Sequence, residues 1–202
     1  MQQIIQIMNS GSILGLFLEV VPITLLVGVA YALWRFIRIK KSGLSFSWGT
    51  EIIRWLFVCY LTGLVNLVLV PSNLWSHFWF YVRNGYATGD GLGWFSGGFN
   101  LVPSLYKCLI GELELGSWVQ IMLVGNILMY APMGFFLPFV SKKMDKGSLL
   151  KLAVAIPVVV EVLQPIVGRS FDVDDLICNF VGIVFGYAVA VAVVCLMKKM
   201  KK

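Results

Sequence analysis

Five stretches of the chain are almost continuously apolar, and each is long enough to form a helix that crosses a membrane. Such a helix needs roughly 20 apolar residues to span a hydrocarbon core about 30 Å thick. The strands of a membrane barrel would instead alternate apolar and polar residues over about ten positions. The pattern therefore predicts an all-α, polytopic membrane helix bundle with five transmembrane helices. These helices are expected at Ile13–Trp34, Ile52–Val70, Trp118–Val140, Leu149–Val167 and Leu176–Met197.

The amino-acid composition agrees with this prediction. Of the 202 residues, 59% are hydrophobic and only 13% are charged, whereas soluble domains carry about 25% charged residues. A chain of this kind cannot cover its exterior with polar side chains, so a soluble globular enzyme is excluded. It is also far too hydrophobic for a disordered protein. The length predicts a single membrane domain over residues 1–202.

The basic residues gather at the ends of the apolar stretches and predict an orientation. Of the 16 Lys and Arg residues, only Arg83, Lys107 and Arg169 fall on the side expected to be external. The positive-inside rule places the other groups and the C-terminus in the cytoplasm, and the N-terminus outside. Because these charges flank apolar runs, we expect no nucleic-acid partner, and we expect contact with anionic membrane lipids as a secondary effect. The predicted cytoplasmic residues are Arg35, Arg38, Lys40, Lys41, Arg54, Lys142, Lys143, Lys146, Lys151, Lys198, Lys199, Lys201 and Lys202.

The sequence leads us to expect neither a cofactor nor a metal ion. The four cysteines, Cys59, Cys108, Cys178 and Cys195, show no CxxC spacing, and the chain has a single histidine. A disulfide framework and a zinc site are therefore not supported. The glycine-rich run GDGLG does not follow an expected strand or open an expected helix, which argues against a nucleotide-binding fingerprint.

The long connection from Pro71 to Ser117 is rich in aromatic residues and glycine and is too apolar for a free loop. Trp and Tyr are enriched at membrane interfaces. We therefore expect this segment to lie in or on the outer interface. His77 stands alone among its aromatic residues, and we interpret it as a packing residue, with a role in proton transfer as the alternative.

Six polar residues lie within the predicted spans, and all of them fall in the external half. Each costs free energy in hydrocarbon, so such residues usually face the bundle interior and find a partner there. Glu161 and Gln164 are three residues apart, which puts them on one face of the fourth span. The six residues are Glu19, Asn66, Asn126, Glu161, Gln164 and Asn179.

The fifth span carries one stripe of polar and small residues. Asp175, Asn179, Gly182 and Gly186 follow one another at intervals of four, three and four residues, a spacing that puts them on one helix face. The small residues Gly182 and Gly186 allow a neighbouring helix to approach closely. The polar ends of the spans, including Asn126 on the third, are then predicted to converge.

The short external turn GRSFDVDD allows three interpretations. In the first, Asp174 caps the fifth helix and Arg169 pairs with Asp172 or Asp175. In the second, the same groups recognise a polar ligand at the outer interface. In the third, Asp172, Asp174 and Asp175 bind a divalent cation, although the spacing lacks the glycine and the distal Glu of a calcium loop.

Three runs of the sequence together resemble the core pattern of VanZ-like proteins. They are FNLVP at Phe99–Pro103, GNILMYAPMGFFLP at Gly125–Pro138, and EVLQPIVGRSFDVDDLICNFVGIVFGY at Glu161–Tyr187. The resemblance covers about residues 99–187, and one departure is Ser104, where family members often have Phe. It implies a bacterial plasma-membrane protein linked to tolerance of teicoplanin and related lipoglycopeptides. The matching positions are Asn100, Asn126, Pro132, Gly134, Glu161, Gln164, Arg169, Asp172, Asp175, Asn179 and Gly182.

Three classes of function follow from this reading. The first is a non-catalytic protein that binds or masks a lipid-linked cell-wall precursor or the lipoglycopeptide itself at the outer leaflet. Its ligand-binding residues would be Asn126, Glu161, Gln164, Arg169, Asp172, Asp175 and Asn179.

The second class is a membrane enzyme that modifies a lipid or cell-wall precursor. In that case Glu161 would be the general base and Arg169 would hold a phosphate or carboxylate. Against it, the sequence shows no nucleophile beside a histidine, no HExxH motif and no phosphate loop. The third class, a small transporter, is disfavoured by the odd number of spans and by the nearly apolar inner halves of those spans.

Overall fold

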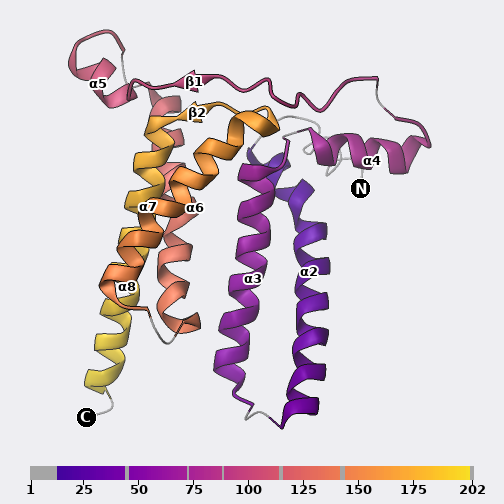
Figure 1. The fold of residues 1–202 in the computed structure, drawn as a ribbon, viewed down its shortest axis with the longest axis vertical. Coiled ribbons are helices and arrows are strands. Elements are labelled where there is room, and N and C mark those ends of the chain that lie inside the picture. Colours follow the sequence, from indigo (N-terminus) through magenta and orange to yellow (C-terminus); the bar gives the residue numbers. More distant parts are fainter. Residues whose placement is uncertain are drawn as a thin grey trace. The chain divides into compact units, whose positions relative to one another are not determined.

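The computed structural model describes residues 13–43, 46–71, 73–87, 89–113, 116–141 and 144–200. Within these ranges, five helices are long and apolar enough to cross a membrane, which confirms the predicted number and type of spans. The side chain of Glu19 and the residues Lys142, Lys143, Lys201 and Lys202 lie outside the described part. The five helices are α2 (Ile13–Ser42), α3 (Trp48–Leu69), α6 (Ser117–Val140), α7 (Lys146–Leu163) and α8 (Val173–Met200) (Figure 1).

Short elements fill the connections between these helices. The long connection contains α4 (Leu74–Asn84), β1 (Phe99–Asn100) and α5 (Ser104–Leu109), and a 3-10 turn, η1 (Gln164–Val167), continues α7. The short turn before α8 forms β2 (Phe171–Asp172), which pairs in parallel with β1. The all-α expectation missed this ladder because two-residue strands leave no periodic pattern in a sequence.

The chain divides into two compact units. The first contains Met1–Gly97 and Ile166–Arg169, and the second contains Gly98–Pro165 and Ser170–Lys202. The first unit is therefore built on α2, α3 and α4, and the second on α6, α7 and α8.

In the first unit, α2 and α3 form an antiparallel hairpin (Figure 1). The indole of Trp55 donates a hydrogen bond to the carbonyl oxygen of Gly28 at 2.9 Å. A Cβ atom at Gly28 would come within 2.8 Å of the sulfur of Cys59, so the glycine is needed for this close approach. Near the C-terminal end of α3, Trp75 of α4 donates a hydrogen bond to Oδ1 of Asn66 at 3.0 Å.

In the second unit, α8 packs against both α6 and α7. The helices α6 and α8 touch through their backbones, because a Cβ atom at Gly134 would overlap the carbonyl of Ile183 and one at Gly186 would overlap that of Ala131. The predicted close approach along the glycine stripe of α8 is thus confirmed, and its partner is α6.

The buried face of α7 continues from an apolar half into a polar end. Leu149, Ala153 and Pro157 are buried along this face. The next two turns bury Glu161 and Gln164, which share the face as predicted from their spacing. The outward face of the same helix exposes large apolar side chains such as those of Val154 and Val162, as expected for a helix surrounded by lipid.

Candidate functional site

The polar end of α7 is organised around Glu161, whose side chain is 0% exposed. Its Oε2 atom accepts a hydrogen bond from the backbone N–H of Asp172 at 2.9 Å. In the amide orientation that satisfies its neighbours, Gln164 donates to the same oxygen at 3.0 Å and to the carbonyl of Ser170 at 3.1 Å. The side-chain amide and the backbone N–H therefore hold the buried carboxylate in one position.

Asp172 connects the strand ladder to the start of α8. Its Oδ1 atom accepts a hydrogen bond from the backbone N–H of Asp174 at 2.8 Å, the arrangement of an N-cap. Its Oδ2 atom accepts from the side-chain amide of Asn100 at 3.0 Å, and Lys107 lies 3.4 Å from the amide oxygen of Asn100. The expectation that Asp174 caps this helix was wrong, because α8 begins at Val173 and Asp174 already belongs to its first turn.

The carboxylate of Asp174 instead fixes the start of α5. It is 7% exposed and accepts the backbone N–H of Ser104 through both oxygens, at 2.8 and 3.0 Å. This carboxylate satisfies a donor that has no partner within a short helix. Because Ser104 donates from its backbone, its departure from the family pattern leaves this bond available to any residue other than proline.

Asp175 is the next residue of α8 and joins this helix to α6. Its Oδ1 atom accepts a hydrogen bond from the side-chain amide of Asn126. One turn further along α8, Asn179 is 2% exposed, and its Oδ1 atom meets no hydrogen-bond donor in the described part of the chain. A buried amide oxygen without a donor is a place where a water molecule or a ligand group can bind.

These contacts separate the three aspartates of the turn. Asp172 accepts hydrogen bonds from the backbone of Asp174 and from Asn100. Asp174 accepts from Ser104, and Asp175 accepts from Asn126. Among the described residues, no three His, Cys, Asp or Glu side chains are grouped so that they could hold a metal ion. The divalent-cation interpretation of the turn therefore receives no support from the geometry.

The cluster is strongly acidic. The charges of Asp172 and Asp175 lie close enough to act on Glu161, and Lys107 is linked to Asp172 through Asn100. A carboxylate and amide cluster of this kind suits ligand groups that donate hydrogen bonds or carry positive charge.

Arg169 lies in the other unit, in the segment Ile166–Arg169. Its side chain is half-buried, and the preceding Gly168 has a φ of +77°, a backbone conformation that favours glycine. A Cβ atom at Gly168 would overlap the carbonyl of Gly93. The proposed pairing of Arg169 with Asp172 or Asp175 stays a prediction.

The first unit contains an open groove of about 360 Å³ between α4 and the residues Ala87, Asp90 and Leu92. Its walls are mostly apolar, with Phe78 and Tyr81 on one side, and its polar members are His77 and Asp90. Whether His77 has the packing role expected from the sequence or the alternative role in proton transfer stays a prediction, and the nearby Asp90 was not anticipated.

The sequence matches the VanZ/LLP1 family over residues 57–196, well over half of its length. The chain belongs to the VanZ/LLP1 family. This confirms the resemblance found in the three sequence runs, and the match begins earlier, inside α3, and extends further into α8. No curated protein and no solved structure matches the chain. With its five apolar helices, this VanZ/LLP1 protein is a multi-pass membrane protein.

Two contacts of the VanZ/LLP1 core were not foreseen from the sequence. The bond from Ser104 to Asp174 uses a backbone donor, which every residue except proline possesses, so no sequence signal could have revealed it. The contact between Asn100 and Asp172 joins residues 72 positions apart. Both residues belong to the family pattern, but the pattern does not say which of its residues contact each other.

Proposed function

We propose that this VanZ/LLP1 protein resides in the bacterial plasma membrane and confers tolerance to teicoplanin and related lipoglycopeptides. It would do so by binding or masking a lipid-linked ligand at the outer leaflet. The ligand-binding residues would be Asn126, Glu161, Gln164, Asp172, Asp175 and Asn179, together with Arg169.

Glu161 is the observation that carries this proposal. A carboxylate that is 0% exposed within a membrane-crossing helix is costly to bury, and such residues usually serve function rather than stability. The hydrogen bonds from Asp172 and Gln164 orient the group. The amide oxygen of Asn179, which has no donor among the described residues, offers a further acceptor on the neighbouring helix.

The chemistry of the cluster favours a ligand rich in hydrogen-bond donors. Carboxylate and amide oxygens accept from the N–H and O–H groups of a peptide or sugar, and they attract ammonium groups. A lipid-linked cell-wall precursor and a lipoglycopeptide both present such groups at the membrane surface. Arg169 would supply the complementary donor for a carboxylate or phosphate of the same ligand.

Drug susceptibility measured alongside protein abundance tests the proposal. Glu161→Gln keeps the size of the side chain and removes its charge, and Arg169→Lys keeps the charge and removes the planar fork. Both variants should abolish tolerance while the amount of membrane protein stays normal. The matched controls are Glu112→Gln and Arg83→Lys, which change exposed side chains and should leave tolerance intact.

Two outcomes would contradict the binding proposal. Normal tolerance at normal abundance in both variants would remove Glu161 and Arg169 from the site. Mass spectrometry of lipids co-purified with the active protein gives the second test, because an intact bound lipid supports binding. A covalently altered precursor whose formation depends on Glu161 would contradict the binding proposal and favour the membrane enzyme.

A further inference from the structure

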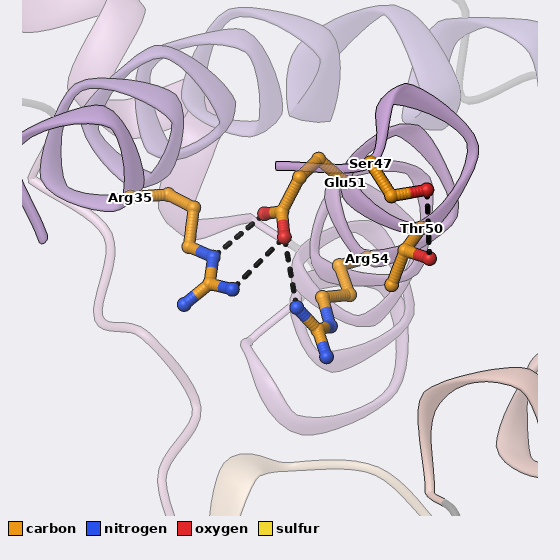
Figure 2. A network of polar contacts seen from close by, with 5 residues as sticks. All are labelled: Arg35, Ser47, Thr50, Glu51 and Arg54. Atoms are coloured by element: carbon orange, nitrogen blue, oxygen red, sulfur yellow. Dashed lines mark hydrogen bonds and ion pairs between the residues drawn. The ribbon is translucent and has the colours of Figure 1, made fainter. Parts of the chain in front are cut away.

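A network of three charged side chains connects the two helices of the first unit near the end where α2 stops and α3 begins (Figure 2). Glu51, in the first turn of α3, accepts two hydrogen bonds from Arg35 of α2, from Nε at 2.6 Å and from the terminal nitrogen Nη2 at 2.9 Å. Arg54 donates from Nη1 to the carboxylate at 2.8 Å. Figure 2 shows both guanidinium groups converging on this one carboxylate.

The network carries more positive than negative charge. Two guanidinium groups share one carboxylate, and their side chains are only 16% and 30% exposed, with Glu51 at 13%. Arg35 is held by two bonds to Glu51. Arg54 is the more exposed of the two, and within the described residues it donates to Glu51 through one nitrogen alone.

Further basic residues surround the same end of the hairpin. Arg38 lies over the ring of Trp34, with its guanidinium carbon 5.2 Å from the ring centre. Lys40 and Lys41 occupy the last turn of α2. From Trp34 to Arg54 the sequence contains five basic residues and one acidic residue, Glu51, so this end of the hairpin has an excess of positive charge that attracts anions.

The depth of the two arginines identifies the kind of anion. Arg35 lies seven residues before the end of α2 and Arg54 six residues after the start of α3, which places both about 10 Å from the helix ends. Trp48, 74% exposed, and its edge-to-face neighbour Phe46 mark the membrane interface at this end. Arginine side chains at this depth extend toward the interface, and the anions of a bilayer there are the phosphates of its lipids.

We propose that this end of the α2–α3 hairpin is a binding site for the phosphodiester group of an anionic phospholipid. Arg54 contributes its remaining N–H groups, and Glu51 holds the two guanidinium groups in place for the phosphate. Arg38, Lys40 and Lys41 add the positive potential that selects a lipid of net negative charge over a zwitterionic one. This role needs the fork of an arginine, whereas orienting the chain in the membrane needs only charge.

Native mass spectrometry of the full-length protein in detergent, titrated with phosphatidylglycerol or phosphatidylcholine, tests the site. The wild type should retain phosphatidylglycerol in preference to phosphatidylcholine. Arg54→Gln should weaken phosphatidylglycerol binding about fivefold and leave phosphatidylcholine binding unchanged. Arg54→Lys should give an intermediate loss. The control Arg83→Gln changes an exposed arginine on α4 that also lies beside an aromatic ring, and it should bind as the wild type does.

Arg54→Gln leaves the double hydrogen bond between Arg35 and Glu51 in place, so the hairpin should fold, and thermal unfolding without added lipid checks this. If the variant does not fold, Arg38→Gln tests the same site from outside the network and should also weaken phosphatidylglycerol binding. Equal retention of phosphatidylglycerol by the wild type and the folded variant would overturn the proposal. Stabilisation of the wild type by millimolar inorganic phosphate, equal to that by phosphatidylglycerol, would overturn the assignment to a lipid.

Discussion

The side-chain amide of Asn126 on α6 donates a hydrogen bond to the carboxylate of Asp175 on α8. These residues are 49 positions apart in the chain. Below them the same two helices touch through their backbones, where a Cβ atom at Gly182 would overlap the carbonyl of Ile127. The polar contact therefore stands at the end of a tightly packed seam, and both features hold α8 in one rotation against α6.

A double-mutant cycle measures the contact between Asn126 and Asp175. Asn126→Ala removes one hydrogen-bond donor from a partly buried carboxylate and should lower the free energy of unfolding by about 1–3 kcal/mol. Combining it with Asp175→Ala should reveal a coupling of about 0.6 kcal/mol and at most about 1.7 kcal/mol, the average and the maximum typical of hydrogen bonds between membrane helices. The free energies come from denaturation of the purified protein in detergent. Strictly additive effects would mean that the bond contributes nothing to stability.

Two alanine substitutions on α6 test the packing of the seam. At Gly134 the new Cβ atom would overlap the backbone of Ile183, whereas nothing lies within 4 Å of the corresponding position at Gly125. Gly134→Ala should therefore lower stability by about 1–3 kcal/mol or more and reduce membrane abundance. Gly125→Ala serves as the control and should keep or slightly raise both. Equal melting temperatures for the two variants would contradict the backbone contact.

The start of α7 should respond to pH through its cap. Asp145 lies just before the helix, and its side chain accepts a hydrogen bond from the backbone N–H of Ser148 at 3.0 Å. The hydrogen bonds from Ser148 lower the pKa of the Asp145 carboxyl from its usual value near 4. A carboxyl whose pKa is lower in the folded state contributes stability above its unfolded pKa and loses it as the pH falls through the folded value.

Melting temperatures of wild type and Asp145→Asn at pH 7 and at pH 3 therefore isolate this contribution. The asparagine can still cap the helix but cannot be protonated. Wild type should lose more stability on acidification than the variant does. A larger loss in the variant would reverse the sign of the effect and contradict the lowered pKa.

The predicted orientation can be read from a reporter fused to the C-terminus. The basic residues beside the apolar stretches predict that this end lies in the cytoplasm, while residues 85–98 lie outside. An alkaline phosphatase fused after the C-terminal lysines should be inactive, because this enzyme needs an oxidising compartment to form its disulfides. The same reporter placed within residues 85–98 should be active. The opposite pattern of activities would invert the topology.

The sequence was informative where an arrangement of side chains follows from their spacing along one helix. Glu161 and Gln164 share a face because they are three residues apart, and the glycines of α8 line one stripe for the same reason. Spacing cannot decide which of several neighbouring aspartates in a turn caps the following helix. Asp172 and Asp174 both suit a cap, and the residue at which α8 begins decides between them.

Contacts between different parts of the chain were harder to foresee. Arg35 and Glu51 are 16 residues apart, and the basic residues near them were interpreted only as orientation signals. The pairing depends on the register of α2 against α3, which Gly28 and Trp55 set by their close contact. The periodicity of a sequence shows which residues share a face of one helix, but it does not predict the register of that helix against its neighbour.

The backbone seam between α6 and α8 restricts which insertions and deletions the gene can tolerate. Asp175 and Gly182 are seven residues apart, close to two full turns of an α-helix. Adding or deleting one residue between them would rotate Asp175 by about 100° away from Asn126 while the glycines stayed against α6. Insertions and deletions should therefore accumulate in the connections between the helices. The interval between Asp175 and Gly182 should stay constant in chains that have both the contact with Asn126 and the glycine seam.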